Sequence, residues 1–173
     1  YISREFQTFG IHLSEELDDY KHKSLYIKLA KTVHRSILEE ALSFCIDSNA
    51  KNKGALFMWK LKELRKNEKN NLFQKVYSLV RSVPEGKVTT YGDISNALKS
   101  QGSPISAQLV GFALHANSGS DNAPCHRVVN KEGRVAPGFA FGGQTVQRQL
   151  LESEGIAFID ETRVDMSKYH FTF

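Results

Sequence analysis

The sequence predicts a mostly helical α/β protein, with a small helix-rich module over residues 1–70 and an α/β domain over residues 71–173. Apolar residues recur at helical spacing along much of the chain, whereas only two short segments, near residues 87–90 and 128–129, have strand character. Signals for turns and short elements become dense only after residue 71. We therefore expect helices first and a small mixed domain after them.

The strongest helical pattern predicts one long amphipathic helix over residues 24–47. Ser24 is expected to cap it, and the turn formers of residues 47–49 end it. Cys45 lies on the apolar stripe, so we interpret it as a core residue, and His34 beside the stripe is interpreted as structural too. The stripe recurs every four residues through Leu25, Leu29, Val33, Ile37, Ala41 and Cys45.

A run of charges over residues 60–69 mixes signs, because Glu63 and Glu68 stand among the bases. Mixed sign favours a solvated helix face or a linker over a nucleic-acid-binding patch. We place the domain boundary near residue 70.

A further helix is expected to begin at Asn71, which is a capping residue type, and to stop at Pro84 and Gly86. The segment at residues 87–90 then predicts a short strand. The apolar positions of the helix are Phe73, Val76, Tyr77, Val80 and Val83.

Two short helices are expected next, separated by the breakers of residues 100–104. Asp93 would cap the first, which runs to Lys99, and Ser103 before Pro104 would begin the second, which ends near Asn117. The pair resembles a helix-turn-helix, whose second helix enters a groove of DNA, although most such pairs only pack. The apolar residues expected to pack from the second helix are Ile105, Leu109, Val110, Phe112, Ala113 and Leu114.

Composition limits the classes of protein that the chain can belong to. A chain of 173 residues with 40% hydrophobic content can fold, and its net charge of +4 permits nucleic-acid binding without arguing for it. Its two cysteines, Cys45 and Cys125, are too few for a disulfide framework and lack zinc-site spacing. We expect an intracellular location, in the cytoplasm, the nucleoid or the nucleus, since no apolar run reaches the roughly 18 residues of a membrane span. The chain begins with Tyr1 and not Met, so a further domain could be fused or missing.

The stretch "NAPCHRVVN" places a nucleophile beside a base. Pro124 restricts the backbone before Cys125, and Val128 with Val129 predicts a buried strand. On a strand the side chains of Cys125 and His126 point to opposite faces, so we expect a water molecule to carry the thiol proton to His126. A free thiol is only a few per cent ionised at neutral pH and needs such a base to act as a nucleophile.

"PCHRVV", with "HAN" before it and "GG" and "LLESEG" after it, resembles the O6-alkylguanine-DNA alkyltransferase family between Val83 and Phe158. The resemblance implies a winged-helix-like C-terminal domain that extrudes O6-alkylguanine from double-stranded DNA. It also implies one irreversible transfer of the alkyl group to a cysteine, a suicide methyltransferase reaction without a metal or another cofactor. We expect a monomer.

The resemblance also implies roles for individual residues. Cys125 would accept the alkyl group, His126 would activate it through water, and Glu154 would orient His126. Asn117 would brace the active-site turn, and Tyr91 would lie beside the extruded nucleotide and assist protonation of the leaving guanine. The DNA-binding residues would be Tyr91, Ser106, Gln108, His115 and Arg127, and the pocket residues would be Val128, Phe141, Gly142 and Gly143.

The chain departs from the family pattern in three places. Gln108 stands where the family has the arginine that takes the place of the flipped base, and glutamine can hydrogen-bond but supplies no charge. The loop of residues 134–143 is about two residues longer than in familiar members, with Ala140 and Phe141 where an aromatic-serine pair is expected. The N-terminal module shows no sign of the ribonuclease-H-like domain that members often carry.

Two other functions stay open. Relatives that recognise alkylated guanine without transfer usually have tryptophan in place of the cysteine, so the presence of Cys125 argues for transfer. The family's arginine is replaced here by Gln108, which argues for recognition alone. A thiol hydrolase with a Cys-His-Glu arrangement would need an oxyanion hole, which the loop sequence does not indicate. For Arg127, an internal clamp and a phosphate contact are both open.

Overall fold

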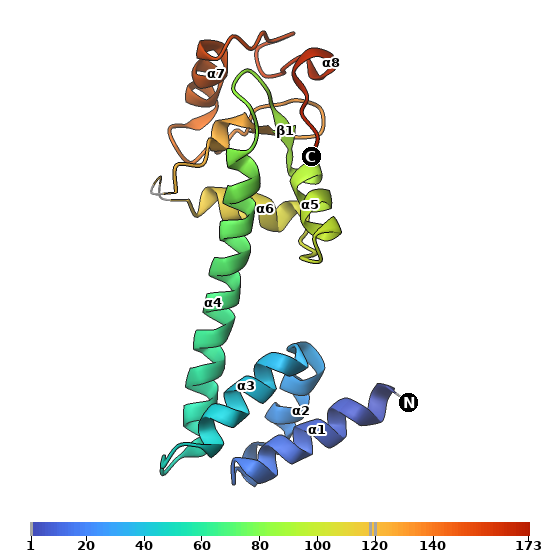
Figure 1. The fold of residues 1–173 in the computed structure, drawn as a ribbon, viewed down its shortest axis with the longest axis vertical. Coiled ribbons are helices and arrows are strands. Elements are labelled where there is room, and N and C mark those ends of the chain that lie inside the picture. The colour runs from blue at the N-terminus through green and yellow to red at the C-terminus, as the bar shows by residue number, and fades with distance from the viewer. Residues whose placement is uncertain (1, 118, 120) are drawn as a thin grey trace. The chain divides into compact units, whose positions relative to one another are not determined.

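The computed structural model describes residues 2–117, 119 and 121–173, and the chain divides into two compact units, Tyr1–Lys69 and Asn70–Phe173. Figure 1 traces the elements, most of which are helices, and the mostly helical α/β class that the sequence predicts is confirmed. Each unit has its own apolar core. The units are therefore described separately.

The first unit consists of helices α1 (Ile2–Glu16), α2 (Lys23–Thr32) and α3 (Arg35–Ile46), a single 3-10 turn η1 (Tyr20–His22), and the beginning of α4 (Lys53–Arg81). The rings of Tyr26 and Phe57 meet edge to face in its core, with centroids 5.8 Å apart. Cys45 is fully buried there, as its place on the apolar stripe predicts.

The single helix expected over residues 24–47 is wrong, because the chain leaves the helical conformation at Val33 and His34. Val33 is extended, with φ −114° and ψ 143°, although its N–H still closes the last turn of α2 on Leu29. Two adjacent β-branched residues, Thr32 and Val33, weaken the helix at this point, and the bend lets α3 bury its own stripe in the same core. Ser24 lies inside α2 and does not cap it; His22 occupies the N-cap position.

Helix α4 is continuous over 29 residues, so the expected start of a helix at Asn71 is wrong. No glycine or proline interrupts the chain between Ala55 and Arg81, and asparagine within a helix costs too little to break it. The helix buries Phe57 in the first unit and Val80 in the second. Figure 1 shows it as one uninterrupted ribbon through the expected boundary near residue 70.

The two short strands that the sequence predicts are present in the second unit, where they form a parallel pair. Strand β1 (Thr89–Thr90) pairs with β2 (Val128–Val129), with Thr89 opposite Val128. All four strand residues are buried. The pair joins a core formed mainly by helices to a second cluster of apolar residues around Leu151.

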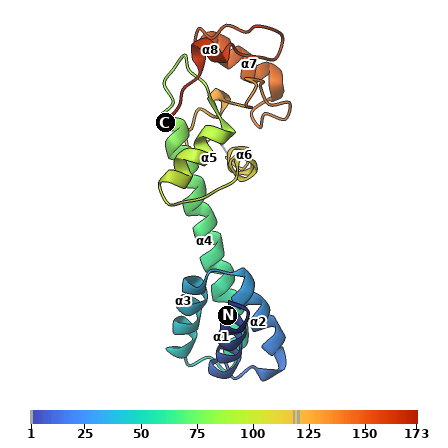
Figure 2. The ribbon, with the colours of Figure 1, turned by 90° about the vertical axis from the view of Figure 1, so that its right-hand side faces the viewer.

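The expected helix-turn-helix is formed by α5 (Tyr91–Ser100) and α6 (Ala107–His115), which lie against each other in Figure 2. The turn between them includes Gly102 at φ +74°, a conformation that glycine adopts without strain.

Both expected caps of this pair are wrong. Thr90 caps α5, and Asp93 completes a capping box by accepting the backbone N–H of Thr90 at 3.2 Å. Ser106 caps α6, whereas the N–H of Ser103 closes the end of α5 on the carbonyl of Leu98 at 2.8 Å.

The segment at Cys125 is also corrected: Cys125–Arg127 forms a 3-10 turn, η2, and the strand begins only at Val128. The N–H of Arg127 donates to the carbonyl of Pro124 at 2.9 Å, and this bond closes the turn. The chain continues to α7 (Gly143–Ser153) and α8 (Met166–Tyr169).

Candidate active site

Cys125 lies in η2, between the end of α6 and strand β2, with 6% of its surface exposed. The side-chain amide of Asn117 points its Nδ2 at the Cys125 Sγ, 3.3 Å away, and its Oδ1 accepts the N–H of Gly119 at 2.9 Å. Burial raises the pKa of the Cys125 thiol, and the hydrogen bond from Asn117 opposes that rise. One side-chain amide thus links the backbone of Gly119 to the sulfur of Cys125, and the role of Asn117 as a brace of the turn stays a prediction.

A cavity of about 70 Å³ opens on Cys125. Tyr91 from the first turn of α5 and His115 from the end of α6 lie on its wall, together with part of the loop of residues 136–141. Burial raises the pKa of the Tyr91 hydroxyl, and the nearby Cys125 adds a smaller rise, so the hydroxyl keeps its proton. The described residues that line the cavity are Tyr91, Gly111, Leu114, His115, Cys125, Ala136, Gly138, Phe139, Ala140 and Phe141.

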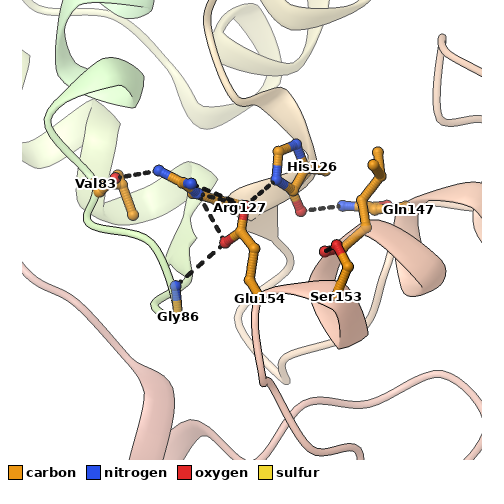
Figure 3. Close-up of polar contacts among 8 residues, drawn as sticks. Val83, Gly86, His126, Arg127, Gln147, Ser153 and Glu154 are labelled. Carbon is orange, nitrogen blue, oxygen red and sulfur yellow. Dashed lines mark hydrogen bonds and ion pairs between the residues drawn. The ribbon is translucent and has the colours of Figure 1, made fainter.

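The carboxylate of Glu154, just after α7, contacts the side chains of His126 and Arg127, the two residues that follow Cys125, as Figure 3 shows. His126 Nε2 lies 2.6 Å from Glu154 Oε1, and Arg127 reaches the same carboxylate through Nε and Nη2 at 2.8–3.0 Å. The N–H of Gly86 donates to Oε2 at 3.2 Å. Burial alone raises the pKa of Glu154, but the hydrogen bonds from Arg127, His126 and Gly86 outweigh it and lower that pKa below its usual range.

This network determines what His126 can do. When Nε2 carries a hydrogen, it donates to the ionised Glu154, and Nδ1 then has the free lone pair of a base. Proton transfer from Cys125 to His126 through water stays a prediction.

Arg127 has a side chain that is 15% exposed. Besides its bonds to Glu154, its Nη1 donates to the carbonyl of Val83 at 2.8 Å. Of the two alternatives for Arg127, this geometry favours the internal clamp over a phosphate contact.

Gln147 was missed by the sequence analysis. It is fully buried in α7; its Nε2 donates to the carbonyls of His126 (3.0 Å) and Val128 (2.9 Å), and its Oε1 accepts the N–H of Ala136 at 2.7 Å. One amide thus joins the active-site turn to the cavity loop. The sequence pattern that could have pointed to Gln147 is its place on the apolar stripe of an amphipathic helix, four residues before Leu151, where a polar residue needs buried partners.

Helix α6 exposes a face that starts at its cap Ser106 and carries Gln108 and His115. Phe112 lies on the same face and is 59% exposed, so the expectation that it packs inside is wrong. The helix turns Val110, Ala113 and Leu114 toward the core instead. An exposed phenylalanine on a potential recognition helix is a second residue that the sequence analysis missed as a candidate contact.

The remaining expected pocket residues lie near the cavity to different degrees. Phe141 lines it, but Val128, Gly142 and Gly143 do not belong to the described residues of its wall. The N–H of Val128 bonds to Cys125 and its carbonyl to Gln147. Gly142 caps α7 at φ +118°, where an added Cβ would come within 2.8 Å of Val146.

Among the described residues there is no group of three or more His, Cys, Asp or Glu side chains placed to hold a metal ion. The described part of the chain also has no helix that is long and apolar enough to cross a membrane.

Comparison with known proteins agrees with this geometry. Residues 71–156 match the family model described as "6-O-methylguanine DNA methyltransferase, DNA binding domain". A DNA base-flipping protein of Escherichia coli (strain K12) is 36% identical over 117 residues, which cover 66% of this chain and 85% of that protein. A methylated-DNA–protein-cysteine methyltransferase of Haemophilus influenzae is 33% identical over 88 residues, 51% of this chain and 46% of that enzyme.

A solved structure is similar as well. The crystal structure of Schizosaccharomyces pombe Atl1 in complex with damaged DNA containing O6-carboxymethylguanine superposes with a TM-score of 0.52 and 29% identity. The superposition covers 60% of this chain and 97% of the Atl1 chain.

Proposed function

The chain belongs to the 6-O-methylguanine DNA methyltransferase family, and from this membership we propose that it repairs DNA by moving the alkyl group of O6-alkylguanine irreversibly to Cys125. The observation that carries the proposal is the placement of the Cys125 Sγ. Cys125 borders a cavity, and its Sγ accepts a hydrogen bond from Asn117. The next residue in the sequence is His126, which pairs with Glu154.

In the proposed reaction the Sγ–carbon bond forms while the carbon–O6 bond breaks, and the bonding electrons of the broken bond remain with guanine. The thiol proton leaves to His126, whose imidazolium Glu154 stabilises, and guanine gains a proton with the help of Tyr91. One proton thus passes from thiol to guanine overall. The S-alkylcysteine that results is a thioether, which water does not hydrolyse, so each molecule reacts once.

The proposed substrate is duplex DNA from which the damaged nucleotide has been rotated out. Extrusion costs a few kcal/mol, and least for a poorly paired base, so a lesion is selected partly by its own instability. The exposed face of α6, with Ser106, Gln108, Phe112 and His115, is the proposed contact with the duplex. Gln108 would hydrogen-bond the orphaned cytosine, and Phe112 would supply the apolar wedge beside it.

A second candidate is recognition of the lesion without transfer. The base-flipping relative and the Atl1 complex support this alternative, as does the neutral Gln108 in place of arginine. Cys125 at the cavity favours transfer.

The deciding experiment is the intact mass of the protein after incubation with an oligonucleotide duplex containing O6-methylguanine. We expect a gain of one methylene on the peptide that contains Cys125, no gain with undamaged DNA, and none in Cys125→Ala, which should still bind. Cys45→Ala is the matched control, because Cys45 is buried in the core of the other unit and should not affect transfer. Binding by the wild type without any mass gain would favour the lesion sensor, and transfer by Cys125→Ala would refute the assignment.

A further inference from the structure

The positive charge of this protein is concentrated on one helix. Helix α4 carries eight Lys or Arg and two Glu, a net +6 against +4 for the whole chain, so the rest of the chain is net negative. In the middle of α4, Lys62, Arg65, Lys66 and Lys69 recur at helical spacing and are all exposed. We call these four residues the basic face.

Three residues of the basic face have no carboxylate partner in the described part of the structure. Among the residues that the structure describes, Lys62, Arg65 and Lys66 form no hydrogen bond or ion pair through their side chains. Of the two carboxylates in this stretch, Glu63 pairs with Lys60 at 3.1 Å, and Glu68 forms no ion pair with Lys62, Arg65 or Lys66 in the described structure.

The spacing of these charges works against the helix itself. Lys62 stands four residues before Lys66, and Arg65 four before Lys69, and like charges at this spacing destabilise a helix. A helix whose only task is to remain solvated would place opposite charges there. These residues are exposed on a helix, as the expected solvated face requires, and an external anion accounts in addition for the like charges placed four residues apart.

We propose that the basic face of α4 binds the phosphate backbone of duplex DNA, in addition to the contact made by α6. The inference rests on the proposed function for its choice of DNA as the polyanion. A membrane surface fits less well, because a helix that lies on lipid needs an apolar stripe along its exposed side. The exposed apolar residues of this part of α4, Met58 and Trp59, both lie before Lys62, and Leu61 and Leu64 pack on the core of the first unit.

Phosphate contacts release counterions, so they are measured by the salt dependence of binding. The test compares the wild type with the variant Lys62→Gln/Arg65→Gln/Lys66→Gln, using the fluorescence anisotropy of a labelled undamaged duplex between about 50 and 200 mM salt. Glutamine has nearly the helix propensity of lysine and arginine, so the helix should persist, which circular dichroism checks. The matched control is Lys23→Gln/Lys28→Gln/Lys51→Gln, which removes the same charge from exposed positions outside α4.

We expect the slope of log K against log salt to decrease in magnitude by about 2.7 for the α4 variant and by less than about 1 for the control. An unchanged slope in the α4 variant, or equal decreases in both variants, would overturn the proposal. The proposal would also be overturned if the α4 variant bound DNA like the wild type but no longer bound anionic phospholipid vesicles.

The same proteins are assayed for mass gain with saturating O6-methylguanine duplex, which separates this proposal from alkyl transfer. If the slope depends on α4 but the wild type gains no mass, the proposed DNA contact of the basic face stands and the proposed alkyl transfer is wrong. If the wild type gains mass but the slope is the same in the α4 variant, alkyl transfer stands and the proposed contact of the basic face is wrong.

Discussion

Glu154 is the residue on which the active-site turn depends. Its carboxylate accepts hydrogen bonds from Arg127 and the Gly86 N–H and lies 2.6 Å from His126 Nε2, while its own side chain is 10% exposed. A buried charge of this kind is stable only while its partners are present. The same contacts place His126 Nε2 against a carboxylate, the arrangement in which a neutral His126 that donates from Nε2 has its Nδ1 lone pair free.

Replacing Glu154 by Gln should therefore affect both stability and transfer. We expect a loss of about 3 kcal/mol in the free energy of unfolding, because Arg127 would be left as an uncompensated, largely buried charge. Urea denaturation measures it. The control is Glu152→Gln, which breaks a partly exposed pair with Arg148 and should cost less than about 1 kcal/mol. Similar small losses in both variants would contradict the role given to Glu154.

The pH dependence of that loss has a definite sign. Because the folded pKa of Glu154 is depressed, its contribution is present above the unfolded pKa and disappears as the pH falls through the folded pKa. The difference between wild type and Glu154→Gln should accordingly shrink in acid, measured by urea denaturation at several pH values. A difference that is constant with pH would disagree with this assignment.

The rate of transfer should also depend on pH, in the opposite range. Burial raises the pKa of Cys125, so the thiol is protonated near neutral pH and the single-turnover rate should increase as the pH approaches that pKa. Asn117→Ala removes the amide donor to Sγ and should shift the rise to higher pH. Quenched reactions followed by mass spectrometry measure both profiles, and an identical profile for the variant would show that Asn117 has no such effect.

At the scale of elements, α5 and α6 divide the tasks. Thr90 and Asp93 form the capping box of α5 and so position Tyr91, the first residue of that helix, on the wall of the cavity. Helix α6 buries Val110, Ala113 and Leu114 and leaves its other face to solvent. Two helices of the same motif thus serve the pocket and the proposed DNA contact.

Phe112→Ala tests that second task. We expect lesion-containing duplex to bind more weakly by about 1–3 kcal/mol, since an aromatic side chain stacks on an unpaired base with an energy of that size. The thermal stability should change little, because Phe112 is 59% exposed. Fluorescence anisotropy measures the binding, and Phe44→Ala, an exposed phenylalanine of the first unit, is the control. Equal affinities for Phe112→Ala and the wild type would exclude a wedge at this position.

At the scale of the whole molecule, the chain has separate cores joined by one continuous helix. Leu38 lies in the core of the first unit and Ile94 in that of the second, and both are fully buried. Between these cores the middle of α4 has only exposed or partly buried side chains over residues 62–72. The boundaries of cooperative unfolding should follow this division.

Calorimetry should therefore show two unfolding transitions. Leu38→Ala should lower the stability of one transition and Ile94→Ala that of the other, each by about 3 kcal/mol, the usual cost of removing a large buried side chain. A single transition that both substitutions lower equally would mean that α4 couples the two cores. The proposal that residues 1–70 form a module of their own would then fail.

Local patterns in the sequence were sufficient for several elements. The breakers around Gly102, the strand character of Thr90 and Val128, and the end of α6 near Asn117 are properties of short segments, and the structure agrees with each. The cap of α5 was misjudged because Thr90 and Asp93 are both capping types three residues apart, and only the backbone conformation distinguishes them. The break at Val33 was missed because a four-residue stripe continues across it, although the two halves pack as separate helices.

By itself the sequence determined the mostly helical class, the helix-turn-helix and the nucleophile candidate Cys125, because propensity, spacing and chemical type are local. Only the tertiary structure decided which groups meet. Glu154 and Gly86, for example, are 68 residues apart, and Gln147 contacts a turn about twenty residues earlier. Such contacts depend on how α7 packs against η2, and packing is a property of the whole core. The exposure of Phe112 was decided in the same way, because an apolar residue at helical spacing faces inward only if another element covers it.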